Sequence, residues 1–245
     1  MSRLTGATVL LGPKTRLGRA VVDDRRGSPL LAVARDPADV GAVAAATGLA
    51  AADIVDASAG ELADRVRALG DGPVRLVVAA LGPVHPLEPD FDADLATVRR
   101  DLGYVDEVLA CGRPVEVVLV STVIALAPGD DRRYYGGWKC LLEELLQQRV
   151  TRTGGRLAVL YPGRLRPGRG GPPWHRLHAS YERLARIALD PGLRPAGRTV
   201  GADARIWLAV RSISFAFRSL SLSSGRDRGA LGGARDSGST GRARE

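Results

Sequence analysis

A tyrosine and a lysine with the spacing of an acid–base pair stand near the middle of the chain. Tyr135 and Lys139 lie four residues apart, and side chains at that spacing share one face of a helix. A phenol with a pKa of about 10 exchanges protons poorly at neutral pH, and a fixed ammonium beside it favours phenolate. Thr122 supplies a hydroxyl that can hold a carbonyl oxygen. These groups predict a site where Tyr135 protonates a carbonyl oxygen while a cofactor delivers hydride to the carbon.

Two predicted elements would position these side chains. Residues 115–120, VEVVLV, form an apolar run that is too short for a helix and is typical of a buried strand. Helical spacing follows from about residue 134, with Leu141, Leu142, Leu145 and Leu146 on one face. Since open α/β sheets bind ligands at the carboxyl ends of their strands, Thr122 should lie beside the pair on the helix.

Lysine is rare in this chain, which bears on the role of Lys139. Lys14 and Lys139 are the two lysines among 35 basic residues, and the rest are arginine. An ammonium is compact and its pKa shifts readily on burial, whereas a guanidinium stays charged. The use of lysine at this position therefore favours a chemical role over that of an ordinary surface cation.

The whole segment resembles the active-site segment of the short-chain dehydrogenase/reductase family. The resemblance rests on the strand, the Ser/Thr pair, the thirteen residues from Thr122 to Tyr135, the Tyr-x-x-x-Lys motif and the apolar helix. It implies a doubly wound parallel sheet with helices on both faces, the Rossmann fold, and implies that Lys139 also binds the nicotinamide ribose. Asp101 stands where the family has an asparagine that links the lysine to solvent, so the implied catalytic residues are Tyr135, Lys139, Thr122 and Asp101. As an anion, Asp101 should pair with Lys139 and hold its proton more tightly.

The expected cofactor turn follows a predicted strand at 7–11. In the family's Gly-x-x-x-Gly-x-Gly turn, Gly12 and Gly18 match the first and last glycines, and Arg16 replaces the middle one. The middle glycine lets the backbone approach the phosphates, so a side chain there either displaces or blocks the cofactor. Alternatively, Arg16 and Lys14 turn outward and contact phosphate directly.

A second predicted strand, 30–34, ends at Arg35 and Asp36. An acidic residue at this place favours the 2′-hydroxyl of NAD, and an arginine accommodates the 2′-phosphate of NADP. Arg35 comes first and basic residues lie nearby in the turn, so NADP is the expected cofactor, and Asp36 keeps NAD open. In the alternative interpretation, the two residues merely begin the helix at 37–47.

Three further positions match cofactor-contacting places of the family. Asp56, at the end of a predicted strand at 52–57, matches an aspartate that meets adenine, or else caps the next helix. Gly82 ends an ALG segment where the family has Asn-Ala-Gly, and Pro162-Gly163 resembles the turn beside the nicotinamide. The resemblance thus implies these cofactor-binding residues: Gly12, Lys14, Arg16, Leu17, Gly18, Arg35, Asp56, Gly82, Tyr135, Lys139, Pro162 and Gly163.

Composition favours one soluble α/β domain. The chain has 245 residues, enough for a single domain at 1–222, and a tail at 223–245 rich in Ser, Gly and Arg reads as disordered. The formal net charge is +8, but the arginines are scattered without interleaved aromatics, so nucleic-acid binding is not expected. No apolar run approaches a membrane span, and the N-terminus predicts a strand and not a signal peptide. The two cysteines form no disulfide framework, and His175 and His178 lack a third clustered ligand, so we expect a cytoplasmic protein without a metal site.

The C-terminal part departs from the family pattern. After an amphipathic helix near 178–191, no last strand is recognised, and residues 201–222 predict an extra helix. Its apolar side carries Trp207, Val210, Ser214, Phe217 and Leu220. A core-packing or dimer helix, a helical hairpin and an interfacial membrane helix all fit this pattern. The segment at 164–180, rich in Pro, Gly and Arg, predicts a substrate lid.

Two functions fit these features. The first is an NADP(H)-dependent oxidoreductase that acts on a small carbonyl or alcohol substrate, with a homo-oligomer as one expected state. The second is a non-catalytic dinucleotide-binding regulator or assembly partner on a degenerate fold of the same family. The arginine in the glycine turn, the missing asparagine before Gly82 and Asp101 favour the second.

Overall fold

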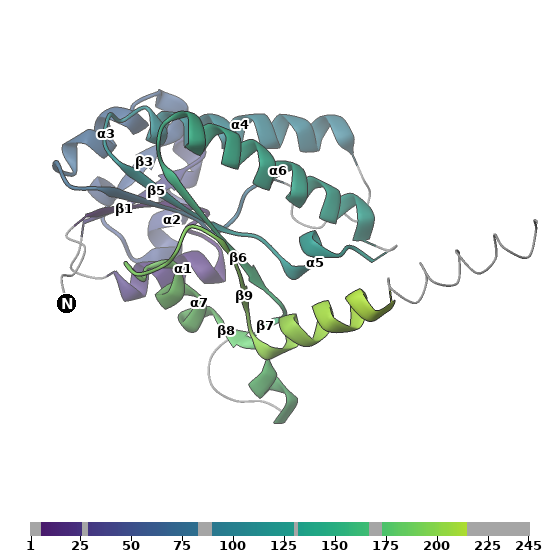
Figure 1. Ribbon diagram of the computed structural model, residues 1–245. Helices are drawn as coiled ribbons and strands as arrows, with labels where there is room; N and C mark the ends of the chain where they lie inside the picture. The colour runs from purple at the N-terminus through teal and green to yellow at the C-terminus, as the bar shows by residue number, and fades with distance from the viewer. Residues whose placement is uncertain (1–5, 26–28, 83–89, 130–131, 167–172, 215–245) are drawn as a thin grey trace, which may run out of the picture. The chain divides into compact units, whose positions relative to one another are not determined.

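A parallel sheet of seven strands forms the centre of the protein in the computed structural model (Figure 1). The structure describes residues 6–25, 29–82, 90–129, 132–166 and 173–214. The strand order is β3-β2-β1-β4-β5-β6-β9, and every neighbouring pair is parallel. The strands are β1 (Ala7–Leu11), β2 (Leu30–Ala34), β3 (Ile54–Asp56), β4 (Val74–Val78), β5 (Val115–Val120), β6 (Arg156–Pro162) and β9 (Gly197–Val200).

Helices cover both faces of this sheet, as the predicted doubly wound architecture requires. On one face α3 (Leu62–Ala68), α4 (Phe91–Leu109) and α6 (Arg133–Arg152) enclose the larger apolar core. On the other face α1 (Arg16–Asp24) and α7 (Tyr181–Ala188) pack together, and α2 (Pro37–Thr47) packs on β2 and β3. Apart from β9, the strands are mainly apolar because both of their faces are buried.

The seventh strand, β9, corrects the prediction that no last strand is present. Its sequence, GRTV, is short, and its first two residues are exposed, so it lacks the apolar run that identifies the other strands. Backbone pairing with β6 defines it, from Val159 opposite Gly197 to Pro162 opposite Val200. A separate parallel pair, β7 (Leu165–Arg166) and β8 (Ala179–Ser180), lies in the segment predicted as a lid, together with a 3₁₀ turn at Pro173–Leu177. Residues 167–172 of that segment lie outside the described residues.

The predicted extra helix is present at 202–214, and residues 215–222 and the tail at 223–245 lie outside the described part of the chain. The contacts divide the chain within this helix into two compact units, Met1–Trp207 and Leu208–Glu245. The predicted boundary between domain and tail at 222/223 stays a prediction. In the first unit, Ala204 is fully buried but Ile206 is 53% exposed. Within that unit, Ala204 is the buried residue at the start of the helix, and the neighbouring Asp203 accepts a hydrogen bond from the Arg164 N–H. None of the helices in the described residues is long and apolar enough to cross a membrane.

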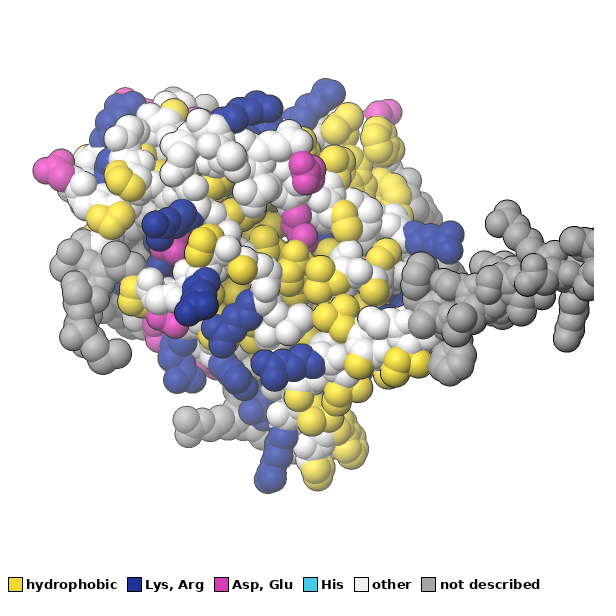
Figure 2. All heavy atoms as spheres, viewed as in Figure 1, with side chains coloured by type: hydrophobic (Ala, Val, Ile, Leu, Met, Phe, Trp, Pro, Cys, Tyr) yellow, Lys and Arg dark blue, Asp and Glu magenta, His cyan; other side chains and the backbone are white. Residues whose placement is uncertain are grey.

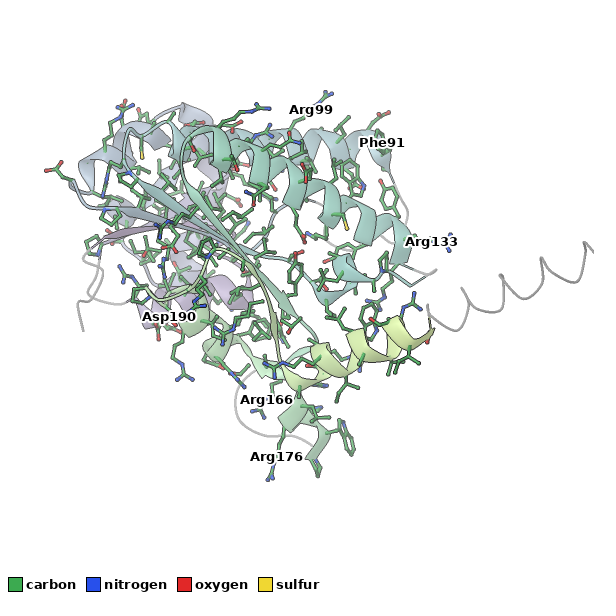
Figure 3. All side chains as sticks on the ribbon, viewed as in Figure 1. Phe91, Arg99, Arg133, Arg166, Arg176 and Asp190 are labelled. Atoms are coloured by element: carbon green, nitrogen blue, oxygen red, sulfur yellow. The ribbon has the colours of Figure 1, made fainter. Side chains whose placement is uncertain are left out.

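Basic side chains gather on the face of the molecule shown in Figure 2, in the part where Figure 3 labels Arg166 and Arg176. Between residues 156 and 205 the described chain carries nine arginines and three acidic residues. Such an excess of one charge raises the local concentration of anionic ligands.

Candidate active site

A cavity of about 220 Å³ lies at the carboxyl ends of β1, β2 and β4. The strand order reverses between β1 and β4, and open α/β sheets bind ligands at such a reversal. The cavity is lined by Leu11, Gly12, Pro13, Lys14, Thr15, Val33, Arg35, Asp39, Val43, Ala80, Leu81, Asp101 and Tyr104. Of the predicted cofactor-binding residues, the fold therefore brings Gly12, Lys14 and Arg35 together here.

Glycine is required at both matched positions of the turn after β1. Gly12 has a φ of +81°, and a Cβ there would lie 2.9 Å from the backbone nitrogen of Ala80. A Cβ on Gly18 would clash with the carbonyl oxygen of Gly12. Thr15 fixes the turn, because its hydroxyl donates to the Gly12 carbonyl (2.8 Å) and accepts from the Gly18 N–H (2.9 Å).

Arg16 and Leu17 do not line this cavity. Arg16 begins α1, is exposed, and lines a different hollow between α1 and α7, beside Tyr181 and Glu182. Leu17 is buried in the core under α1. The interpretation in which Arg16 contacts a phosphate in the cavity therefore finds no support in the geometry, and of the two basic residues in the turn only Lys14 lines it.

The two basic groups at the cavity are already paired with acidic residues. The Arg35 guanidinium lies 3.4 Å from Asp101 Oδ2, and the Lys14 ammonium pairs with Asp39 in the first turn of α2. This lysine lowers the pKa of the Asp39 carboxyl. Asp36 is the N-cap of α2, and its carboxylate accepts from the Asp39 N–H (2.9 Å), so the helix-start interpretation holds for this residue. The sequence analysis did not identify Asp39. Its position in the first turn of a predicted helix, where acidic residues are favourable, could have indicated it.

Asp101 links the end of β4 to α4. Its side chain is almost fully buried, and its Oδ2 accepts from the backbone N–H of Gly82 (3.0 Å), which has a φ of +66°. Its Oδ1 is buried without a hydrogen-bond partner and lies 3.6 Å from Arg100 Nε. Tyr104, which sequence reasoning also missed, lies three residues further along α4 and donates to the Arg35 carbonyl (3.1 Å). Asp101 is thus an ion partner of two arginines, and it acts on Lys139 through its charge.

Lys139 and Tyr135 lie together on α6 as their spacing predicts. The Lys139 ammonium is 5.3 Å from the centre of the Tyr135 ring and donates to the carbonyl oxygen of Leu81 (2.7 Å), a residue that lines the cavity. Burial lowers the pKa of Lys139 to about 8, against the charges of Asp101 and Glu143, which raise it. Lys139 therefore contacts a residue that lines the cavity, whereas neither Lys139 nor Tyr135 lines the cavity itself.

The pKa of Tyr135 differs from the sequence expectation. Burial raises it, and the charge of Arg132 opposes that shift. The sequence predicted that Lys139 lowers the pKa of Tyr135. In the structure, desolvation of the phenolate outweighs the effect of nearby cations on that pKa. The phenol of Tyr135 is therefore protonated at neutral pH and suited to donate a proton.

The hydroxyls after β5 have separate partners. Thr122 is the N-cap of α5 (Val123–Leu126), and its Oγ1 accepts from the Ile124 N–H (3.3 Å). Ser121 donates to Glu143 Oε1 (2.5 Å), and the Tyr161 hydroxyl donates to Glu143 Oε2 (2.7 Å). Sequence reasoning missed Glu143, whose signal is its place four residues after Lys139.

Tyr134, the neighbour of the candidate acid, has a packing role. Its hydroxyl donates to Asp94 Oδ2 on α4 (2.7 Å), and its ring meets Trp138 edge-on. It lines a hollow with Phe91 and Arg133, which Figure 3 labels at the start of α4 and α6. This arrangement favours Tyr135 as the candidate acid.

The remaining predicted cofactor residues lie outside the cavity lining. Asp56 caps the 3₁₀ turn Ala57–Ala59 and accepts from the Ser58 N–H (2.9 Å), whereas α3, the helix that it was expected to cap, follows Glu61 without a side-chain cap. After Pro162, the last residue of β6, Gly163 lies against the Asp203 carboxylate, which accepts from the Arg164 N–H (2.7 Å). In the described residues, no group of three or more His, Cys, Asp or Glu side chains could hold a metal ion.

Solved short-chain dehydrogenase/reductases have a similar fold. A short-chain type dehydrogenase/reductase from Mycobacterium ulcerans is 16% identical with a TM-score of 0.59, and the match covers 84% of this chain and 92% of that chain. Carveol dehydrogenase from Mycobacterium avium, in complex with NAD, is 15% identical with a TM-score of 0.57, covering 84% and 100%. No protein-family model and no curated protein matches the sequence. The chain thus has the short-chain dehydrogenase/reductase fold in a divergent form, which confirms the predicted fold class.

Proposed function

We propose that this chain is an oxidoreductase that uses a nicotinamide dinucleotide and transfers hydride to or from a small carbonyl or alcohol substrate. The observation that supports this most is the partly buried ammonium of Lys139, which lies over the Tyr135 ring and donates to the carbonyl oxygen of Leu81, a residue that lines the cavity. Taking a lysine ammonium out of water costs free energy. Ionisable groups with perturbed pKa values beside a cavity are typical of active sites.

The cavity suits the adenosine half of the cofactor. The side-chain-free backbone at Gly12 opens onto it, and Val33 and Val43 offer apolar walls. When bound, the cofactor supplies the hydride donor or acceptor. Arg35 and Lys14 line this cavity and would turn from Asp101 and Asp39 to the 2′-phosphate of NADP, and Asp36 is engaged in capping α2. Two similar structures carry NAD, which supports a nicotinamide dinucleotide in general.

Each residue of the site has a definite task in this proposal. Tyr135 holds the proton that is transferred to the carbonyl oxygen, and its raised pKa keeps that proton in place at neutral pH. Thr122 orients the oxygen, because a hydroxyl that accepts from Ile124 still has its own hydrogen to donate. Lys139 provides a positive charge beside the phenol and a donor for the ribose, and Asp101 helps to keep that lysine charged.

The proposal is tested by titrating the purified chain with NADPH and NADH and measuring turnover across a broad carbonyl panel. Tight binding of NADPH together with turnover that depends on Tyr135 supports the enzyme. Binding without turnover supports the dinucleotide-binding regulator. Binding of neither cofactor removes both functions and leaves only the fold.

A further inference from the structure

A small cavity lies at the amino ends of the central strands, at the opposite edge of the sheet from the candidate active site. Its volume is about 40 Å³, and it is lined by residues near the start of β1, β4 and β5, by Arg25 after α1 and by Leu189 after α7. A single water molecule needs about 10 to 15 Å³, so the cavity has room for an ion of the size of chloride. We propose that this cavity binds a small monovalent anion, with the Arg25 guanidinium and the Thr8 hydroxyl as its donors.

A row of polar side chains crosses the sheet at this cavity. Thr8 on β1 is paired in register with Arg75 on β4, and Arg75 is paired with Glu116 on β5, so the three side chains share one face of the sheet. The Arg75 guanidinium donates to Glu116 Oε2 (2.5 Å) and to the carbonyl oxygens of Ala188 (3.3 Å) and Asp190 (2.8 Å), the residue that Figure 3 labels after α7. Arg75 therefore ties the end of α7 to the sheet through bonds within the fold.

Two donors beside this row have no partner among the described residues. Thr8 is 2% exposed and lines the cavity, and its hydroxyl makes no hydrogen bond within the described part of the chain. Arg25 donates through Nη2 to the carbonyl oxygen of Gly6 (3.1 Å), whereas its Nε is buried without a hydrogen-bond partner. A buried donor without a partner costs free energy, so an acceptor that enters the cavity is bound favourably.

The charges at the cavity favour an anion over water. Two guanidiniums and one carboxylate line it, and the carboxylate of Glu116 is already paired with Arg75. Burial lowers the pKa of Arg25, the charge of Arg75 lowers it further, and the charge of Asp24 opposes these effects. An anion beside Arg25 would offset the repulsion between the two guanidiniums. The small volume and the single excess positive charge select a monovalent ion over sulfate or phosphate.

Thermal unfolding of the full chain tests this in solution. Chloride replaces gluconate at constant ionic strength, because gluconate is too large for the cavity. An anion that binds only the folded chain should raise the melting temperature by about 3 to 6 °C at ten times its Kd. Arg25→Gln should abolish this rise. The matched control is Arg152→Gln, at an exposed arginine in the last turn of α6, and it should keep the full rise.

A second variant tests the site without a change of charge. Thr8→Val keeps the shape of the side chain and removes its hydroxyl. In gluconate this variant should be at least as stable as wild type, because it leaves no unpaired hydroxyl buried. Its Kd for chloride should be weaker by about tenfold or more, because a hydrogen bond to an ion is lost.

The outcomes separate a specific site from general screening. If chloride raises the melting temperature equally in wild type, Arg25→Gln and Thr8→Val, it acts elsewhere and the proposal is overturned. Should Arg25→Gln not fold, line broadening of the chloride NMR signal decides. Broadening by wild type that Thr8→Val reduces and that bromide but not sulfate reverses supports the site. The absence of such broadening means that the cavity holds only water and overturns the proposal.

Discussion

The ammonium of Lys139 lies 5.3 Å from the centre of the Tyr135 ring and points its hydrogen bond at Leu81, not at the phenol. Burial dominates both groups, so the pKa of the lysine falls to about 8 and that of the tyrosine rises. Each group is thereby biased toward its neutral form. A neutral phenol is a proton donor, so the raised pKa of Tyr135 suits it to protonate a carbonyl oxygen in the proposed reaction.

This bias predicts the pH dependence of turnover. In the reductive direction, kcat/KM should be nearly constant from about pH 6 to 7.5 and should fall above about pH 8, as Lys139 loses its proton. Tyr135 does not limit the rate in this range, because its raised pKa keeps it protonated. A pH–rate profile with NADPH and one reducible carbonyl checks this. A rate that climbs through pH 8 to 9 would contradict the assignment of Lys139.

Substitution of the two adjacent tyrosines separates chemistry from packing. Tyr135→Phe keeps the ring and removes the hydroxyl, so turnover should fall by about 10²- to 10⁴-fold while NADPH affinity holds. Tyr134→Phe removes only the hydrogen bond to Asp94 and should lower the melting temperature slightly without changing turnover. Turnover and cofactor titration of both variants give the answer. Loss of activity in Tyr134→Phe alone would make Tyr134 the acid, and Ser121, thirteen residues before it, would then replace Thr122 as the orienting hydroxyl.

Local sequence patterns account for most of this fold. Six of the seven strands are apolar runs, and the four-residue spacing of Tyr135 and Lys139 is enough to place them on one helix face. The strand β9 has no such pattern, since only its backbone pairing with β6 defines it. Backbone pairing between distant segments cannot be predicted from a short, polar sequence that has no local strand pattern.

The partners within the site could not be predicted for the same reason. Asp101 reaches the Gly82 N–H across nineteen residues, and Arg35 reaches Asp101 across sixty-six. The sequence indicated that Asp101 carries a charge but not that two arginines share it. The direction of the Tyr135 shift likewise depends on burial, which the residue types near it do not reveal.

Arg35 should determine the choice between NADPH and NADH. A charge-assisted contact with phosphate contributes about 1.5 to 3 kcal/mol, so Arg35→Ala should weaken NADPH binding by about tenfold or more and leave NADH binding almost unchanged. Arg16→Ala is the matched control, because Arg16 lines the hollow between α1 and α7 and not the cavity. Fluorescence titrations of both variants with both cofactors measure this. Equal losses for NADPH and NADH would assign Arg35 to the fold and not to the phosphate.

Replacing Lys139 should stabilise the protein while it removes activity. The pKa of Lys139 falls from 10.5 in the unfolded chain to about 8 in the folded one, so below pH 8 burial of the charge costs at most about 3 kcal/mol. Lys139→Met removes that cost but loses the hydrogen bond to Leu81, worth about 1 kcal/mol, and should therefore raise the unfolding free energy at pH 7 by about 1 to 2 kcal/mol.

The pH dependence of that gain follows from proton binding. Between pH 8 and about 10 the unfolded wild-type chain binds more protons at Lys139 than the folded chain does, so wild-type stability rises with pH relative to the variant. The advantage of Lys139→Met should thus shrink between pH 7 and 9.5 in paired urea titrations. Lys14→Met, at an exposed lysine, should show no such change between the two pH values. A variant that is less stable than wild type at pH 7, with a gap independent of pH, would show that the Lys139 ammonium is not desolvated as the structure indicates.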